Sequence, residues 1–110
     1  MNDNVQKMNK NKNLENEFQL LRQIRRKPKA SQRELARNLD MSLGKLNYCI
    51  KALKEKGFVK IANFKNNPNK VNYLYILTPK GIAEKSKMTI NFMRKKMQEY
   101  DELKSELKND

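Results

Sequence analysis

Residues 42–60 read SLGKLNYCIKALKEKGFVK, and this stretch decides the fold. Its apolar residues recur at helical spacing, and Ser42 is of a residue type that caps helix N-termini, so a helix is predicted to begin there. Gly57 is predicted to end this helix as a C′ glycine, and Phe58 opens a strand-like run. The apolar stripe of the helix consists of Leu46, Cys49, Ile50 and Leu53.

The other side of this helix is polar and basic. Its Lys, Asn and Tyr side chains cluster in the first three turns, the part of a recognition helix that meets base edges. The amide of Asn47 offers a donor and an acceptor that suit adenine, while Tyr and Lys suit phosphate and base contacts. The alternative is a lysine-rich face that only meets solvent. The candidate DNA-reading residues are Ser42, Lys45, Asn47, Tyr48 and Lys51.

Two shorter helices are predicted upstream. The apolar spacing from Leu14 predicts a helix that ends near Arg26, because the residue before Pro28 is biased away from helix. Ser31 and Glu34 have the spacing of a capping box, so a second, short helix should start at Ser31 and end near Asp40.

A hairpin and a long helix are predicted downstream. Residues 58–64 and 71–77 are rich in strand formers, and the polar segment 65–70 between them contains a proline. Thr78 and Pro79 then have the pattern of an N-cap followed by the first helical residue. This last helix is predicted to reach about Lys108, a length of about 45 Å at 1.5 Å per residue.

The order of elements predicts a mainly α fold with a small β-hairpin. It is that of a winged helix-turn-helix followed by a long C-terminal helix. We expect residues 1–12, which are rich in Asn and Lys, to be a disordered basic tail. Residues 13–78 would form the DNA-binding domain, and residues 79–110 a helix for dimerisation.

The charge of the chain favours a polyanionic partner. The 110 residues include 25 Lys and Arg against 12 Asp and Glu, for a net charge of +13. Nucleic acid is the simplest polyanion that such a charge would attract. A genome of biased base composition would also produce many Lys and Asn codons without any such function. Residues 99–110 differ from the rest, with five acidic and two basic residues.

Several functions have little support in this composition. The chain has no His and a single cysteine, Cys49, which we expect to be a small buried hydrophobe. We therefore expect no metal site, no cofactor and no enzymatic activity. No apolar run approaches the roughly 20 residues of a membrane span, and the N-terminus lacks an apolar signal core. The expected location is the cytoplasm.

Three segments together resemble MarR-family winged-helix transcriptional regulators. They are SQRELARNL (31–39), the stretch 42–60 and LTPKG (77–81). The similarity spans about residues 14–107, and the segment SLGKLNY is most similar to a small subgroup associated with extracellular polysaccharide gene clusters. The resemblance implies a homodimer that binds a pseudo-palindromic operator in double-stranded DNA and regulates polysaccharide biosynthesis genes.

The resemblance also implies roles for residues outside the third helix. Ser31, Gln32 and Arg33 would touch phosphate at the start of the second helix. The wing would reach the backbone or the minor groove through Lys65, Asn67 and Lys70, since its tip lacks the arginine typical of the family. A small-molecule effector stays open, because the larger family members enclose their ligand pocket with longer terminal helices.

The last helix carries an apolar stripe that outruns a core of one small domain. From Ile90 onward the stripe approximates a heptad repeat, which suits a coiled coil or interlocked helices in a dimer. The alternative is that it packs only on its own domain. The predicted dimer interface, with a contribution from the first helix, consists of Leu14, Phe18, Ile90, Met93, Met97, Tyr100, Leu103 and Leu107.

Two other binding functions remain as alternatives. A winged-helix module that binds an acidic protein partner would use the same positive charge. RNA binding would use Tyr48, Tyr73 and Tyr75 to stack on bases, although the two strand tyrosines are expected to serve core packing.

Overall fold

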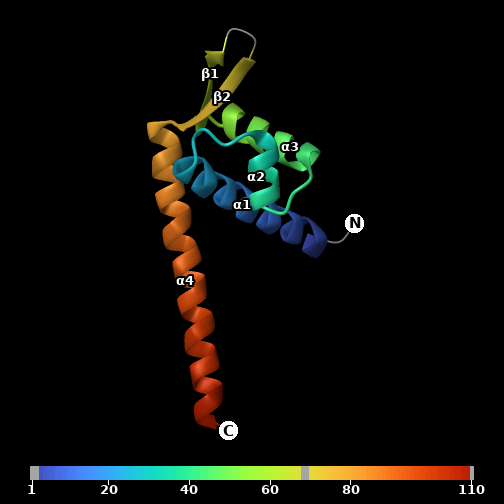
Figure 1. The fold of residues 1–110 in the computed structure, drawn as a ribbon. Helices are drawn as coiled ribbons and strands as arrows, with labels where there is room; N and C mark the ends of the chain where they lie inside the picture. Colours follow the sequence, from blue (N-terminus) through green and yellow to red (C-terminus); the bar gives the residue numbers. More distant parts are fainter. Residues whose placement is uncertain (1–2, 68–69, 110) are drawn as a thin grey trace.

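The computed structural model describes residues 3–67 and 70–109 (Figure 1), with the side chains of residues 12–63 and 73–109. The order of elements is the predicted one. The helices and strands are α1 (Asp3–Arg26), α2 (Gln32–Asn38), α3 (Leu43–Glu55), β1 (Val59–Asn67), β2 (Lys70–Leu77) and α4 (Pro79–Asn109).

Side-chain caps start three of the helices where the sequence predicts them. The Ser31 hydroxyl accepts a hydrogen bond from the Glu34 backbone N–H at 3.1 Å. The Ser42 hydroxyl accepts one from the Lys45 N–H, also at 3.1 Å. Thr78 Oγ1 accepts one from the Gly81 N–H at 3.0 Å. Each cap satisfies an N–H group that has no partner within its helix, which fixes the start of α2, α3 and α4.

The first helix is longer than predicted. The structure begins α1 at Asp3, within the segment 1–12 that was expected to be a disordered tail. Polar composition alone suggested disorder, but residues 3–26 contain neither proline nor glycine to break a helix. The helix that the apolar spacing places from Leu14 therefore continues toward the N-terminus.

The core lies where α1, α2 and α3 meet the base of the hairpin. Its fully buried side chains come from every one of these elements, so the three helices and the hairpin form one unit. These side chains are Leu20, Leu21, Ile24, Leu35, Leu46, Leu53 and Tyr75.

The turn between α2 and α3 is tight. Asp40 has a φ of 53°, a left-handed conformation that Asp tolerates better than most side chains. The N–H of the next residue, Met41, donates to the carbonyl of Ala36 at 2.8 Å. This closure of α2 sets the angle at which α3 leaves the turn.

The hairpin is antiparallel and longer than predicted. Val59 pairs with Leu77 and Ile61 with Tyr75, and the pairing continues to Asn67 and Lys70 with an irregularity after Lys65. Tyr75 also donates its N–H to the Pro28 carbonyl at 3.1 Å, which ties the hairpin to the segment before α2. The far end of the hairpin projects away from the helices (Figure 1).

The last helix leaves the domain on the opposite side from the hairpin (Figure 1). Met88 is buried, and the Phe92 ring stacks on Phe18 of α1 with centroids 4.6 Å apart. Beyond Phe92 all side chains of α4 through Asn109 are exposed. The radius of gyration is 17.5 Å, against about 13 Å for a compact chain of this length, because α4 extends so far.

Candidate nucleic-acid interface

The exposed face of α3 carries three of the predicted DNA-reading residues. Asn47, Tyr48 and Lys51 are exposed, and the Tyr48 side chain is 62% accessible. Ser42 is exposed at the N-terminal end of the helix. The predicted apolar stripe is buried on the other side of α3. This face therefore offers an amide, a phenol and an ammonium group to a partner that lies along the helix.

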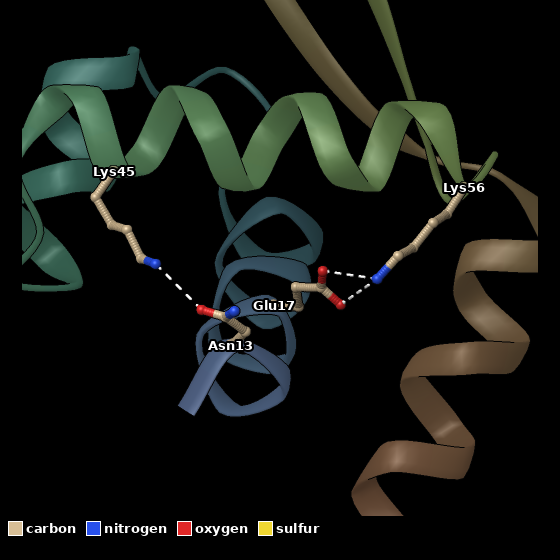
Figure 2. A network of polar contacts seen from close by, with 4 residues as sticks. All are labelled: Asn13, Glu17, Lys45 and Lys56. Atoms are coloured by element: carbon tan, nitrogen blue, oxygen red, sulfur yellow. Dashed lines mark hydrogen bonds and ion pairs between the residues drawn. The ribbon is translucent and has the colours of Figure 1, made fainter. Parts of the chain in front are cut away.

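Lys45 is placed differently from the other four predicted residues. It is half-buried, and its Nζ donates to the Asn13 Oδ1 on α1 at 3.1 Å (Figure 2). The same Nζ lies 5.3 Å from the centroid of the Tyr48 ring. The Lys45 ammonium group thus holds the start of α3 against α1 and lies beside Tyr48, at the edge of the exposed face.

An ion pair holds the other end of α3 to α1. The Lys56 Nζ lies 2.8 Å from Glu17 Oε1 and 3.0 Å from Oε2 (Figure 2). Glu17 is only 7% exposed, so its carboxylate depends on this partner. Sequence reasoning missed the pair and read Lys56 as general positive charge. No local pattern could reveal it, because 39 residues separate the two side chains.

We expect Lys56→Met to destabilise the fold by about 1–3 kcal/mol, since it leaves a buried carboxylate without its counter-ion. The measurement is urea unfolding of the variant and the parent protein. Lys54→Met is the matched control, because Lys54 is exposed in the same turn and should change stability by less than about 0.5 kcal/mol. Equal stability of the two variants would show that the Glu17 pair contributes nothing.

Cys49 lies between these two contacts and is buried, as predicted. It is 3% exposed, and burial raises the pKa of its thiol above the ordinary value. The nearby Lys45 ammonium group opposes that rise, and the Glu17 carboxylate adds to it. A thiol that is both buried and protonated is a packing group rather than a reactive one.

A second polar cluster lies where the start of α2 meets the base of the hairpin. A shallow hollow of about 350 Å³ brings Ser31, Gln32 and Arg33 together with Lys29, Leu43, Tyr73 and Tyr75. Ser31 and Arg33 are exposed, and Gln32 is half-buried. The structure therefore joins the predicted phosphate-contacting residues to the N-terminal end of α3 on one surface. Sequence reasoning missed Lys29, although its charge next to Pro28 was visible.

The two strand tyrosines have different environments. Tyr75 is 1% exposed, and burial raises the pKa of its phenol, an effect that a hydrogen bond with Gln32 partly offsets. Tyr73 is 53% exposed, so the expectation of core packing is confirmed for Tyr75 and is wrong for Tyr73. Both point to the same side of β2, but Tyr73 lies farther along the strand, beyond the edge of the core.

The predicted wing contacts are only partly described. The backbone of Lys65, Asn67 and Lys70 lies in the paired strands. Their side chains lie outside the described ones, and Pro68 and Asn69 lie outside the described residues. The contacts of the wing with DNA therefore stay a prediction.

Comparisons with known proteins agree with this geometry. Residues 14–60 match the family model described as winged helix-turn-helix DNA-binding. A Staphylococcus aureus MarR protein, solved in complex with salicylate and kanamycin, has a similar structure with a TM-score of 0.53 and 21% sequence identity. The match covers 74% of this chain and 53% of that protein, so the chain spans about half the length of its structural relative. No curated protein matches the sequence.

The fold is a winged helix-turn-helix. In this winged helix-turn-helix, α2 and α3 are the helix pair, the β1–β2 hairpin is the wing, and α4 is an extension of the domain. The predicted fold class is thereby confirmed.

Two further searches of the molecule found nothing within the part of the winged helix-turn-helix chain that the structure describes. Across residues 3–67 and 70–109, no helix is both long and apolar enough to cross a membrane. Within the same ranges, no three His, Cys, Asp or Glu side chains are grouped so as to hold a metal ion.

Proposed function

We propose that the protein is a transcriptional regulator that binds specific sequences of double-stranded DNA as a homodimer. Each protomer places α3 in the major groove and the wing on the backbone or minor groove, and the protein works in the cytoplasm. The observation that carries the proposal is the exposed face of α3, on which Asn47, Tyr48 and Lys51 stand free of the core. Half-sites would lie one helical turn, about 10–10.5 bp, or a multiple of it apart.

The charged groups around α3 divide into two sets under this proposal. Lys45 and Lys56 make contacts with α1 and position the helix. Lys51, together with Arg33 at the start of α2, is exposed to a phosphate backbone. Contacts of this second kind supply affinity without sequence preference, and the affinity they supply falls steeply with salt.

The test is binding of fluorescent promoter DNA from the protein's own gene neighbourhood, with scrambled DNA of the same length as the comparison. We expect the promoter to bind more tightly in moderate salt, where non-specific contacts are weakened. Equal affinities would rule out sequence specificity. A shift in native electrophoresis by a co-purifying acidic protein, and none by DNA, would support the protein-interaction alternative.

We expect Asn47→Ala to reduce the preference for operator over scrambled DNA by about 5- to 100-fold. The amide is suited to a bidentate contact with adenine, and such contacts contribute about 1–3 kcal/mol of discrimination. Because Asn47 is exposed, stability should be unchanged. The measurement is a pair of binding titrations with operator and scrambled DNA.

Lys51→Ala provides the comparison for Asn47→Ala. Loss of a phosphate contact should weaken all DNAs alike and lower the dependence of log affinity on log salt by about one. An Asn47→Ala protein that keeps the full preference of the parent would exclude Asn47 from base reading.

The target genes are a further part of the proposal. Resemblance of the segment SLGKLNY to regulators associated with polysaccharide gene clusters supports polysaccharide biosynthesis genes as targets. Transcript levels in a deletion strain test this part by itself. Unchanged polysaccharide transcripts would reject those targets and leave DNA binding untouched.

A further inference from the structure

A continuous apolar stripe lies exposed along α4. Met88 and Phe92 face α1, whereas the stripe lies on the side of the helix away from the domain, so it does not pack on its own protomer. Its side chains are 41–76% exposed. The members of this α4 stripe are Ile82, Ile90, Met93, Met97, Tyr100, Leu103 and Leu107.

The stripe follows a heptad repeat over its outer half. Ile90, Met93, Met97 and Tyr100 are separated by three, four and three residues, and the repeat continues through Lys104 to Leu107. This is the spacing of the a and d positions in a two-stranded coiled coil, with Lys104 at an a position. Apolar side chains at such spacing along a projecting helix fit a second helix with the same repeat.

The charges beside the stripe change sign along the helix. Residues 85–96 carry five basic side chains and no acidic one, whereas residues 99–107 carry four acidic side chains and one basic one. Most of these charges have no partner within the protomer that would neutralise them. The described ion pair of this region joins Lys96 to Glu99 at 3.5 Å, and both side chains are exposed. Such pairs are weak.

We propose that the α4 helices of two copies pair antiparallel over residues 90–107, so that the basic half of each lies against the acidic half of the other. The centre of symmetry lies between Met97 and Tyr100. Ile90 then faces Leu107 of the partner subunit, and Arg94 faces Asp101 of the partner subunit. The inference rests on the proposed homodimer and adds the orientation of its helices.

The orientation follows from charge. A parallel pair in register would bring the two basic halves together and the two acidic halves together, which is unfavourable along the whole length. It would also place Lys104 against its own copy in the apolar interface. A parallel pair does gain Lys96 opposite Asp101 of the partner subunit. The antiparallel pair gains an equivalent contact through Arg94, and it places Lys104 beside Met93 of the partner subunit without a like charge opposite.

Disulfide cross-linking of the full chain distinguishes the two orientations. Ile90→Cys and Leu107→Cys are made separately in a Cys49→Ala background, and one of the two proteins carries a tag so that mixed dimers differ in size. The proteins are oxidised alone and after subunit exchange. The antiparallel pair predicts that the mixture forms the cross-linked heterodimer. Each protein alone should give little product, because its two thiols are about 25 Å apart.

Ser105→Cys replaces Leu107→Cys in the control, because Ser105 lies on the outward side of α4 near the same end and should not cross-link to Ile90→Cys. Efficient cross-linking of each protein with itself would show a parallel pair and overturn the orientation. A dimer by sedimentation that forms neither product would overturn pairing through the stripe while the homodimer stands. A monomer by sedimentation at all concentrations would reject the homodimer as well.

Discussion

Gly81→Ala is expected to destabilise the domain by roughly 3 kcal/mol or more, because an added methyl group has no room there. A Cβ atom at this position would lie 2.0 Å from the carbonyl oxygen of Phe58, which belongs to the backbone and has no side-chain freedom to move away. The same oxygen accepts a hydrogen bond from the Thr78 N–H at 3.0 Å. Relief of the clash would therefore break the junction between the wing and α4.

Thermal and urea unfolding at fixed protein concentration measure this effect. Gly44→Ala is the matched control, since nothing lies within 4 Å of the Cβ that it would add in α3. This control should stabilise the helix by up to about 1 kcal/mol, the usual gain when alanine replaces a helical glycine. Equal stability changes at the two positions would contradict the close approach of Gly81 to Phe58.

A double substitution in the α4 stripe is expected to have the largest effect on DNA binding. Met97→Glu with Tyr100→Glu places four carboxylates at the centre of the proposed dimer, so we expect a monomer. A monomer contacts one half-site only, and we expect operator affinity to fall by two orders of magnitude or more as avidity is lost. Sedimentation measures the oligomeric state, and binding to operator DNA measures the affinity.

Gln98→Glu with Ser105→Glu adds the same charge on the outward side of α4 and is the control. It should leave the dimer intact and weaken binding only modestly, through the general field of the protein. A monomeric Met97→Glu, Tyr100→Glu protein with full operator affinity would show that one domain suffices for binding.

Much of this fold is encoded locally, which is why sequence reasoning could predict it. Ser31, Ser42 and Thr78 cap their helices through hydrogen bonds that span three residues. Apolar spacing in α3 predicted its buried side, and Gly57 ends the helix with a φ of 78°. Such signals depend on neighbours in the chain, so the positions of the elements follow from them.

The surroundings of the candidate site depend instead on how the elements cross. Lys45 looked equivalent to Lys51 by its place in the polar half of α3, yet α1 passes beside it and supplies Asn13 as a partner. Glu17 similarly meets Lys56 only because the two helices pack together. Periodicity predicts which side of a helix is buried, but it does not predict which polar groups at the border face a neighbouring helix.

The length of α4 gives it the properties of a ruler for operator spacing. In the antiparallel pair, the two Pro79 residues lie about 58 Å apart along the helices, whereas one turn of DNA spans about 34 Å. A heptad inserted before Ile90 would move the two domains about 21 Å farther apart, which is about six base pairs. Insertions in one solvent-exposed helix would thus change which operators are read, without altering a single residue that touches a base.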